Sequence, residues 1–253
     1  MSMQDTTALL DGKTALVTGG ARRIGAHIAR LLHAQGMNLV LHYHRSAEEA
    51  EALQAELEAE RPHSVTLIQA DLLDTARLPA LAESAHAVWG RLDVLVNNAS
   101  TFYPTPVGEI TEKVWDDLVG TNLKAPLFLS QAAAPFLAAH QGCIVNLVDI
   151  HAVRPLKGYP VYSAAKAGLY MLTQSLAREL GPAIRVNGVA PGAILWPEQS
   201  ENAAMHEALI ERTALKREGS PDDVARAVLF LVRDAGYITG HLLPVDGGRM
   251  LSH

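Results

Sequence analysis

Cysteine is almost missing from this chain, which has one such residue, Cys143, among 253. A single thiol cannot form an intrachain disulfide, so we expect a fold held by packing alone. No apolar run approaches the roughly 20 residues of a membrane span, and the first residues lack the basic and apolar regions of a signal peptide. Lys and Arg total 21 against 27 for Asp and Glu, which excludes a broad basic surface. We therefore expect a cytoplasmic protein with neither nucleic acid nor membrane as partner.

Short apolar segments alternate with longer amphipathic ones along the chain. The apolar segments predict seven strands, over 13–18, 38–44, 64–69, 93–97, 143–148, 184–189 and 241–245. Strands that alternate with helices favour parallel pairing, and continuously apolar strands are typical of a sheet covered on both faces. The sequence therefore predicts a single α/β domain over 1–253: a Rossmann-like, doubly wound parallel sheet of seven strands with helices on both faces. Within it, the irregular stretch 192–218 follows the sixth strand and is expected to cover a substrate.

Capping and helix-breaking residues predict where helices start and bend. Ser46 has an acidic residue three positions on, which is a capping-box pattern. Thr111 and Ser220 are placed to cap later helices. Pro126 predicts a kink in the long helix that starts after Thr111. Two further helices are predicted over 75–89 and from Tyr162 to about residue 180.

A glycine-rich turn joins the first strand to the first helix and reads Thr-Gly-Gly-Ala-Arg-Arg-Ile-Gly over 18–25. Gly19 and Gly20 permit a tight turn and close approach to a ligand, and Gly25 permits close packing of the helix on the sheet. The helix N-terminus offers free N–H groups and the positive end of its dipole. The position between a strand and a helix, at the start of the chain, favours a phosphate site over a plain turn.

Tyr162 and Lys166 lie four residues apart, on one face of a predicted helix. A phenol has an unperturbed pKa of about 10, and a nearby cation lowers it by roughly 1–3 units. Such a pair could give a phenol that transfers protons. The same spacing also occurs by chance, so two solvated side chains are the alternative.

Three further motifs accompany these: Asn97-Asn98-Ala99, Asn122 and Pro191-Gly192. In order and spacing, the set resembles the short-chain dehydrogenase/reductase family over essentially the whole chain. The turn over 18–25 is similar to the family's TGxxxGxG loop, and Tyr162 with Lys166 is similar to its YxxxK pair. The resemblance implies a nicotinamide cofactor, a small-molecule substrate and a homotetramer packed through long helices.

Two residues depart from the family pattern. Arg23 stands where the middle glycine of the turn is usual, and Asp149 stands 13 residues before Tyr162, where a serine is usual. Both departures are features of the pteridine reductase branch, which the stretches 42–46 and 97–106 also resemble. The chain is therefore identified as a member of that branch, of the bacterial type, and reduction of pterins or folates is implied.

The end of the second predicted strand bears on the choice of nicotinamide. An acid there would select NAD through the ribose 2′-hydroxyl, but this chain has His42, Tyr43, His44, Arg45 and Ser46. A guanidinium and a serine at a helix N-terminus can hold a 2′-phosphate, so we expect NADPH. His42 and His44 share a strand face, but no third ligand is visible and we expect no metal. The resemblance adds further cofactor-binding residues: Gly19, Arg22, Arg23, Ile24, Gly25, Asp71, Leu72, Asn98, Ala99, Ser100, Lys166, Pro191 and Gly192.

The resemblance also implies a catalytic set, which consists of Asp149, Tyr162, Lys166 and Asn122. Lys166 would hold the ribose and lower the pKa of Tyr162, and Asn122 would keep a water in a proton relay. An ionised Asp149 polarises a carbonyl badly, but it can orient Tyr162 or pass a proton from water, which suits a C=N bond. The substrate would lie against Arg23, Ser100, Phe102, Asp149 and Tyr162, with Phe102 stacking a flat heterocycle. A second phenol, Tyr159, lacks a lysine four residues on and is expected to line the pocket at most.

Two other functions remain open at this point. A short-chain reductase of a carbonyl substrate, such as a 3-oxoacyl thioester or a sugar, has the same fold, although Arg23 and Asp149 argue against it. A non-catalytic sensor of NADP(H) would not need the catalytic residues, but Tyr162, Lys166 and Asn122 are all present.

Overall fold

The predicted strands form one parallel sheet in the computed structural model, which describes residues 10–194 and 210–251. Their bounds are β1 Thr14–Val17, β2 Asn38–Tyr43, β3 Val65–Gln69, β4 Val94–Asn97, β5 Cys143–Leu147, β6 Arg185–Pro191 and β7 Leu242–Val245. The spatial order is β3-β2-β1-β4-β5-β6-β7, and every neighbouring pair is parallel. The order changes direction between β1 and β4, so the loops that leave these strands diverge and open a crevice. The predicted doubly wound sheet of seven strands is confirmed.

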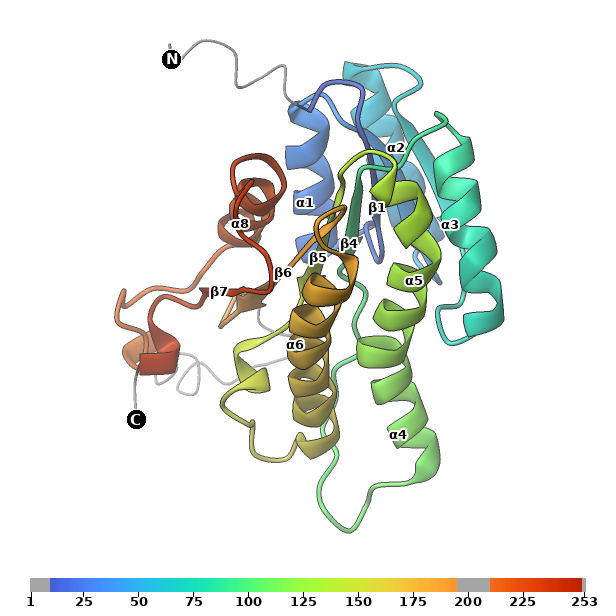
Figure 1. Cartoon of the computed structure of the whole chain (residues 1–253). Helices are drawn as coiled ribbons and strands as arrows, with labels where there is room; N and C mark the ends of the chain where they lie inside the picture. The colour runs from blue at the N-terminus through green and yellow to red at the C-terminus, as the bar shows by residue number, and fades with distance from the viewer. Residues whose placement is uncertain (1–9, 195–209, 252–253) are drawn as a thin grey trace.

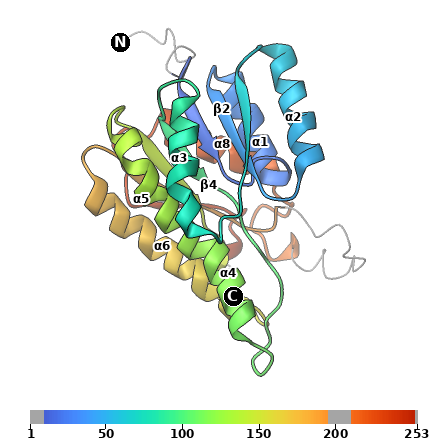
Figure 2. The ribbon, with the colours of Figure 1, turned by 90° about the vertical axis from the view of Figure 1, so that its right-hand side faces the viewer.

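Helices cover both faces of the sheet, as the apolar strands predict (Figure 1). One face is covered by α1 Arg23–Ala34, α2 Ala47–Glu60 and α8 Pro221–Arg233. The other is covered by α3 Leu78–Ala87, α5 Ala125–Ala138 and α6 Pro160–Leu180, with α4 Glu112–Val119 extending beyond the sheet (Figure 2). Short 3₁₀ segments are η2 Thr75–Arg77, η4 Ile150–Ala152 and η5 Arg249–Leu251.

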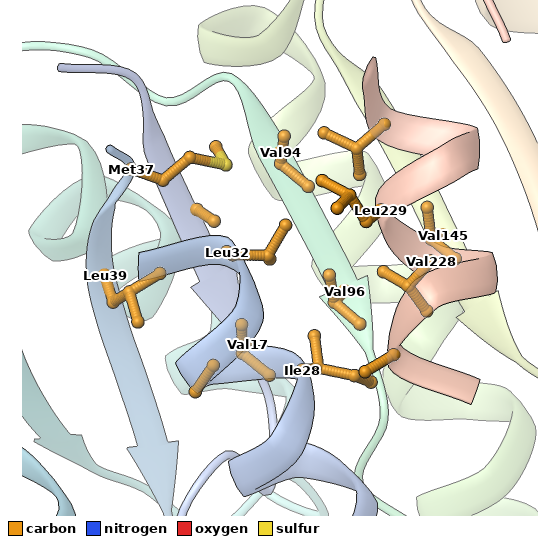
Figure 3. Packing of buried hydrophobic residues seen from close by; sticks show 14 of the residues in the cluster. Val17, Ile28, Leu32, Met37, Leu39, Val94, Val96, Val145, Val228 and Leu229 are labelled. Carbon is orange, nitrogen blue, oxygen red and sulfur yellow. The ribbon is translucent and has the colours of Figure 1, made fainter. Parts of the chain in front are cut away.

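The larger core cluster lies between α1, α8 and the sheet (Figure 3). Ile28 and Leu32 of α1 face Val228 and Leu229 of α8, over buried valines of β1 and β4. Burial of each such side chain contributes about 1.5–3 kcal/mol relative to exposure. This packing holds the start of α1, and with it the glycine turn, against the carboxyl end of β1.

The start of α2 differs from the sequence prediction. Ser46 makes no side-chain hydrogen bond there, so the expected capping box does not form. Its intended partner, Glu49, instead lies 3.7 Å from Arg22 of the glycine turn. Thr111 and Ser220 do cap α4 and α8, and Ser220 forms a complete capping box. A tertiary contact with another loop therefore replaced the local bond at α2.

The irregularity expected at Pro126 occurs just before it. A π-helical turn, Gly120–Lys124, separates α4 from α5 and contains Asn122. Pro126 has no N–H to donate to the carbonyl four residues earlier, which is that of Asn122, so the regular α-helical hydrogen bonding is interrupted there. The helix predicted over 75–89 is likewise divided into η2 and α3, and α6 begins at Pro160, two residues before Tyr162.

Most of the predicted substrate-covering loop, 192–218, lies outside the described residues, which omit 195–209. Among the helices that are described, none is long and apolar enough to cross a membrane.

Candidate active site

The glycine turn over 18–25 lies at the carboxyl end of β1. Gly19 has φ +59°, which glycine adopts without strain. A Cβ on Gly25 would lie 2.2 Å from the carbonyl oxygen of Gly19, so no larger residue fits there. Unlike α4 and α8, α1 begins without a side-chain cap. Its first amides are therefore open to an anion, and the turn fits the pyrophosphate of a dinucleotide.

Arg23 has a backbone conformation that favours glycine. Its φ is +52°, in the left-handed region, where a residue with a Cβ costs roughly 1–2 kcal/mol. Its side chain is exposed. Strain that persists in a folded protein is typical of functional positions, because the surrounding structure must enforce it. The turn thus carries a guanidinium where the family pattern has none.

His42 lies beneath the turn and supports it. The Gly19 N–H donates to His42 Nδ1 at 3.2 Å, and His42 Nε2 lies 3.1 Å from the Ala70 carbonyl oxygen. Burial lowers the pKa of His42 to about 4, so the ring is neutral and carries its proton on Nε2. His42 therefore joins the carboxyl ends of β1, β2 and β3. The sequence prediction had grouped it with the cofactor contacts, and nothing local revealed this buried role.

The residues after His42 form an exposed rim. His44 and Arg45 are exposed, while Tyr43 and Ser46 are half-buried. His44 Nε2 lies 3.9 Å from the nearer carboxylate oxygen of Asp71, which follows β3. Arg45 makes no ion pair with the residues that the structure describes, so its guanidinium is available to an anionic group.

A second loop, after β4, closes onto the glycine turn. Thr18 Oγ1 accepts from the amides of Asn98 and Ala99 at 3.0 and 3.1 Å. The Asn98 side chain donates to the carbonyls of Thr18 and Gly19 at 2.9 and 3.0 Å. These bonds fix the crevice between β1 and β4. Of the remaining predicted cofactor residues, the half-buried ones are Ile24 and Gly192 and the buried ones are Leu72 and Pro191.

Three of the predicted catalytic residues meet where β5 ends and α6 begins. The Tyr162 hydroxyl donates to Asp149 Oδ2 at 2.7 Å. Asp149 Oδ1 accepts the His151 amide at 2.8 Å, a bond that starts η4 and fixes the carboxylate. Lys166 Nζ donates to the Leu147 carbonyl at 2.8 Å and lies 5.7 Å from the ring centre of Tyr162.

The protonation of this group differs from the sequence prediction. Burial raises the pKa of Tyr162 well above its usual value, and the charge and hydrogen bond of Asp149 raise it further. Lys166 is buried too, and burial lowers the pKa of its ammonium to about 8, although Asp149 opposes that shift. The expected lowering of the Tyr162 pKa by Lys166 is therefore wrong for the chain by itself. Tyr162 is a neutral phenol that donates to a carboxylate.

Asn122, the fourth predicted catalytic residue, is buried in the π-helical turn. Its Nδ2 donates to the carbonyls of Leu118 and Thr101, both at 2.9 Å. Its Oδ1 accepts from the Ser100 hydroxyl at 2.6 Å. The side chain therefore satisfies backbone at the break between α4 and α5 and holds the loop that carries Ser100. Ser100 also interacts with the Tyr162 phenol, which connects Asn122 to the other three residues.

Three aromatic rings stand together at the site. Phe102 and Tyr159 are stacked, with ring centres 4.6 Å apart and planes 9° apart. Phe102 and Tyr162 meet nearly edge to face, at 4.8 Å and 76°. Phe102 remains 48% exposed. Sequence reasoning placed Phe102 at this site but missed its stacking on Tyr159, because the two residues belong to loops far apart in the chain.

The fold and this site define a class, the nicotinamide-dependent oxidoreductases with a glycine turn after β1 and a Tyr–Lys pair in α6. A family model described as Enoyl-(Acyl carrier protein) reductase matches residues 19–249. The chain belongs to the short-chain dehydrogenase/reductase family, whose members use NAD(P)H.

Individual relatives share the class and differ in substrate. The chain is 41% identical to Pteridine reductase 1 of Leishmania tarentolae, over 94% of this chain and 96% of that protein. It is 38% identical to the 3-oxoacyl-(acyl-carrier-protein) reductase of Staphylococcus aureus, over 93% of this chain and 97% of the relative. The corresponding enzyme of Staphylococcus epidermidis is 37% identical, over 93% and 98%. These identities are too similar to decide the substrate.

Proposed function

We propose that this chain is an NADPH-dependent pteridine reductase, which reduces dihydropterins to tetrahydropterins and has folates as further candidate substrates. The observation that supports it is the 2.7 Å hydrogen bond from Tyr162 to Asp149. A carboxylate at this position repels the negative charge that develops on the oxygen of a reduced carbonyl. The same carboxylate can accept hydrogen bonds from the N–H groups of an aminopteridine. The 41% identity to a protein named pteridine reductase agrees with this choice.

When bound, NADPH supplies a hydride to a carbon of the substrate's C=N bond. The raised pKa keeps Tyr162 protonated at neutral pH, so its hydroxyl can give a proton to the adjacent ring nitrogen. One C–H and one N–H bond form, and the double bond becomes single. Tyr162 is only 4% exposed, whereas Asp149 is half-buried and closer to solvent. Asp149 is therefore the group that would return a proton from water to Tyr162.

The cofactor preference rests on the rim and the glycine turn. The exposed guanidinium of Arg45 and the amide end of α2 at Ser46 would hold the 2′-phosphate of NADPH. Lys166, with a pKa of about 8, carries a charge at pH 7 and would donate to the hydroxyls of the nicotinamide ribose. Arg23 would reach the pyrophosphate and the edge of the substrate.

The test is oxidation of NADPH by the purified protein with dihydrobiopterin, with folate and with a 3-oxoacyl thioester. We expect turnover of the pterin by the wild type and a loss of about 100-fold or more in Asp149→Ser, with NADPH binding retained. Asp116→Ser, which removes an exposed carboxylate of α4, is the matched control. Oxidation with the thioester alone would overturn the pterin assignment in favour of a carbonyl reductase. Tight NADPH binding without any oxidation would support a sensor.

We also propose that the chain forms a homotetramer through the layer of α4, α5 and α6 (Figure 2). Each of these helices exposes a large apolar side chain: Trp115 at 48%, Phe128 at 38% and Met171 at 63%. Apolar side chains that gather on one face of a protein are typical of association surfaces. Light scattering should give the mass of four chains, and Met171→Lys should reduce it.

A further inference from the structure

The loops after β4 and before α6 hold each other in place at the site. The Thr105 amide, in the first loop, donates to the Gly158 carbonyl of the second at 2.7 Å. The first loop is also anchored to α4, since the Tyr103 hydroxyl donates to Asp117 at 2.7 Å. The backbone that carries Phe102 is therefore fixed next to the start of α6. The Phe102 ring itself remains 48% exposed and depends on side-chain contacts for its orientation.

Tyr159 is rigidly placed beside that ring. Its N–H donates to the Leu156 carbonyl at 3.1 Å, and its carbonyl accepts the Ser163 amide at 3.0 Å as the first turn of α6 forms. Ser163 Oγ in turn accepts the Leu156 amide at 3.2 Å. Tyr159 is the N-cap residue of α6, and its ring lies nearly flat on that of Phe102, with ring centres 4.6 Å apart.

We propose that Tyr159 is a positioning residue that holds the ring of Phe102 in one plane, so that the opposite face of Phe102 receives a flat nitrogen heterocycle. This inference rests on the proposed pteridine reductase function. A half-exposed phenylalanine can otherwise rotate about its side-chain bonds, and a ligand that needs one orientation binds in proportion to the population of that orientation. A stacked aromatic pair changes such a population by about 2- to 10-fold.

Tyr159 acts through Phe102 because the geometry keeps it from the substrate. Tyr159 covers one face of Phe102 at 4.6 Å. A substrate stacked on the other face adds a similar spacing, so its ring would lie roughly 9 Å from that of Tyr159. Tyr162, by contrast, meets Phe102 nearly edge to face and points its hydroxyl to Asp149. The two tyrosines thus have separate roles: Tyr162 acts on the substrate, and Tyr159 acts on the Phe102 ring against which the substrate stacks.

A double-mutant cycle tests this directly. Tyr159→Leu, Phe102→Leu and the double variant would be compared with the wild type for kcat and KM with dihydrobiopterin and for the Kd of NADPH. We expect Tyr159→Leu to raise KM by about 2- to 10-fold while kcat and the Kd of NADPH stay unchanged. In the Phe102→Leu background the same change should have no further effect, because the ring that it positions is gone. Tyr159→Phe, which keeps the aromatic face and loses the hydroxyl, should behave as the wild type.

The other outcomes are distinct from one another. Additive effects of the two leucine variants would show that Tyr159 touches the substrate itself and would overturn the positioning role. A lower KM in Tyr159→Leu would show that its ring competes with the substrate for Phe102, which also overturns it. A wild type that oxidises NADPH with a 3-oxoacyl thioester but with no pterin would overturn the proposed function as well. Retained NADPH binding shows that each variant is folded.

Discussion

The two ends of the crevice are built in different ways. At the end of β5, Tyr162 and Lys166 are buried, each donates a hydrogen bond of 2.7 or 2.8 Å, and both have shifted pKa values. At the end of β2, His44 and Arg45 are exposed, and the His44 ring lies 3.9 Å from the carboxylate of Asp71, which follows β3. The residues at the β5 end are therefore desolvated and hydrogen-bonded, whereas the side chains at the β2 end are solvated and make few contacts.

This difference indicates how each end works. Electrostatic interactions between buried groups are strong because little water screens them, and each group there depends on its neighbours. Exposed ion pairs contribute only about 0–1 kcal/mol each and weaken with salt. The buried end should therefore determine the reaction through a few residues with large effects. The exposed end should determine the cofactor through several residues with small effects.

The largest effect is expected at the buried end, in Tyr162→Phe. The change removes the phenol that donates a proton to the substrate, and general acid catalysis contributes about 10²–10⁴-fold to a reaction rate. We expect kcat to fall by about 10³-fold while the Kd of NADPH is unchanged. Steady-state kinetics and cofactor fluorescence titration give both values. A variant that keeps most of its activity would show that the proton comes from another group.

The second-largest effect is expected for His42, which is buried although it lies at the end of β2, beside the exposed rim. Its folded pKa of about 4 lies below the usual 6.5, so the unfolded chain binds a proton that the folded chain excludes. The stability contributed by neutral His42 is present above pH 6.5 and is lost as the pH falls to about 4. We expect the wild type to lose about 2–3 kcal/mol more than His42→Gln over this range.

Urea unfolding at pH 7, 5.5 and 4 measures this difference. Glutamine can accept from Gly19 and donate to Ala70 as the imidazole does, so the fold should survive. His44→Gln is the matched control, since it removes an exposed histidine two residues along the same strand end. Equal pH dependence in the wild type and both variants would mean that His42 is not buried in neutral form.

At the exposed rim, Arg45→Ala should change the preference between cofactors. Loss of a solvated guanidinium that contacts the 2′-phosphate should weaken NADPH binding by about 10-fold. Binding of NADH, which lacks that phosphate, should be unaffected. The measurement is kcat/KM for both cofactors at low and high salt, and the wild-type preference for NADPH should itself shrink with salt. Equal losses for the two cofactors would place Arg45 away from the 2′-phosphate.

The smallest effect is expected from Glu49→Gln. Glu49 lies 3.7 Å from Arg22, and both side chains are about half exposed or more, so the acid partly neutralises a cation next to the rim. Removal of the Glu49 charge should lower the Kd of NADPH by about 2-fold at low salt and should leave it unchanged at high salt. Glu51→Gln, elsewhere on α2, carries the same charge change as a control. A tighter NADPH complex in both variants would indicate a general charge effect and no special role for Glu49.

The sequence predicted the parts of this site that depend on local pattern. The Gly19–Gly25 turn between β1 and α1 could be predicted because strand, glycines and helix follow one another in the chain. Tyr162 and Lys166 could be paired because helical spacing puts them on one face. Ser46 shows the limit of such reasoning: Ser46 and Glu49 match the capping-box pattern, but the box does not form, and Glu49 pairs with Arg22. The local capping bond is weak, and the contact between Glu49 and Arg22 becomes possible only when the chain folds.

The order of apolar and amphipathic segments thus determined the sheet, its parallel strands and the place of the crevice, since these follow from periodicity and connection. Three features were decided only by tertiary structure: the support of the glycine turn by His42, the raised pKa of Tyr162 and the stacking of Phe102 on Tyr159. Each depends on burial or on contact between distant segments. Desolvation has no signature in a local sequence, and here, with Asp149, it raised the pKa of the Tyr162 phenol, whereas the sequence predicted a lowered one.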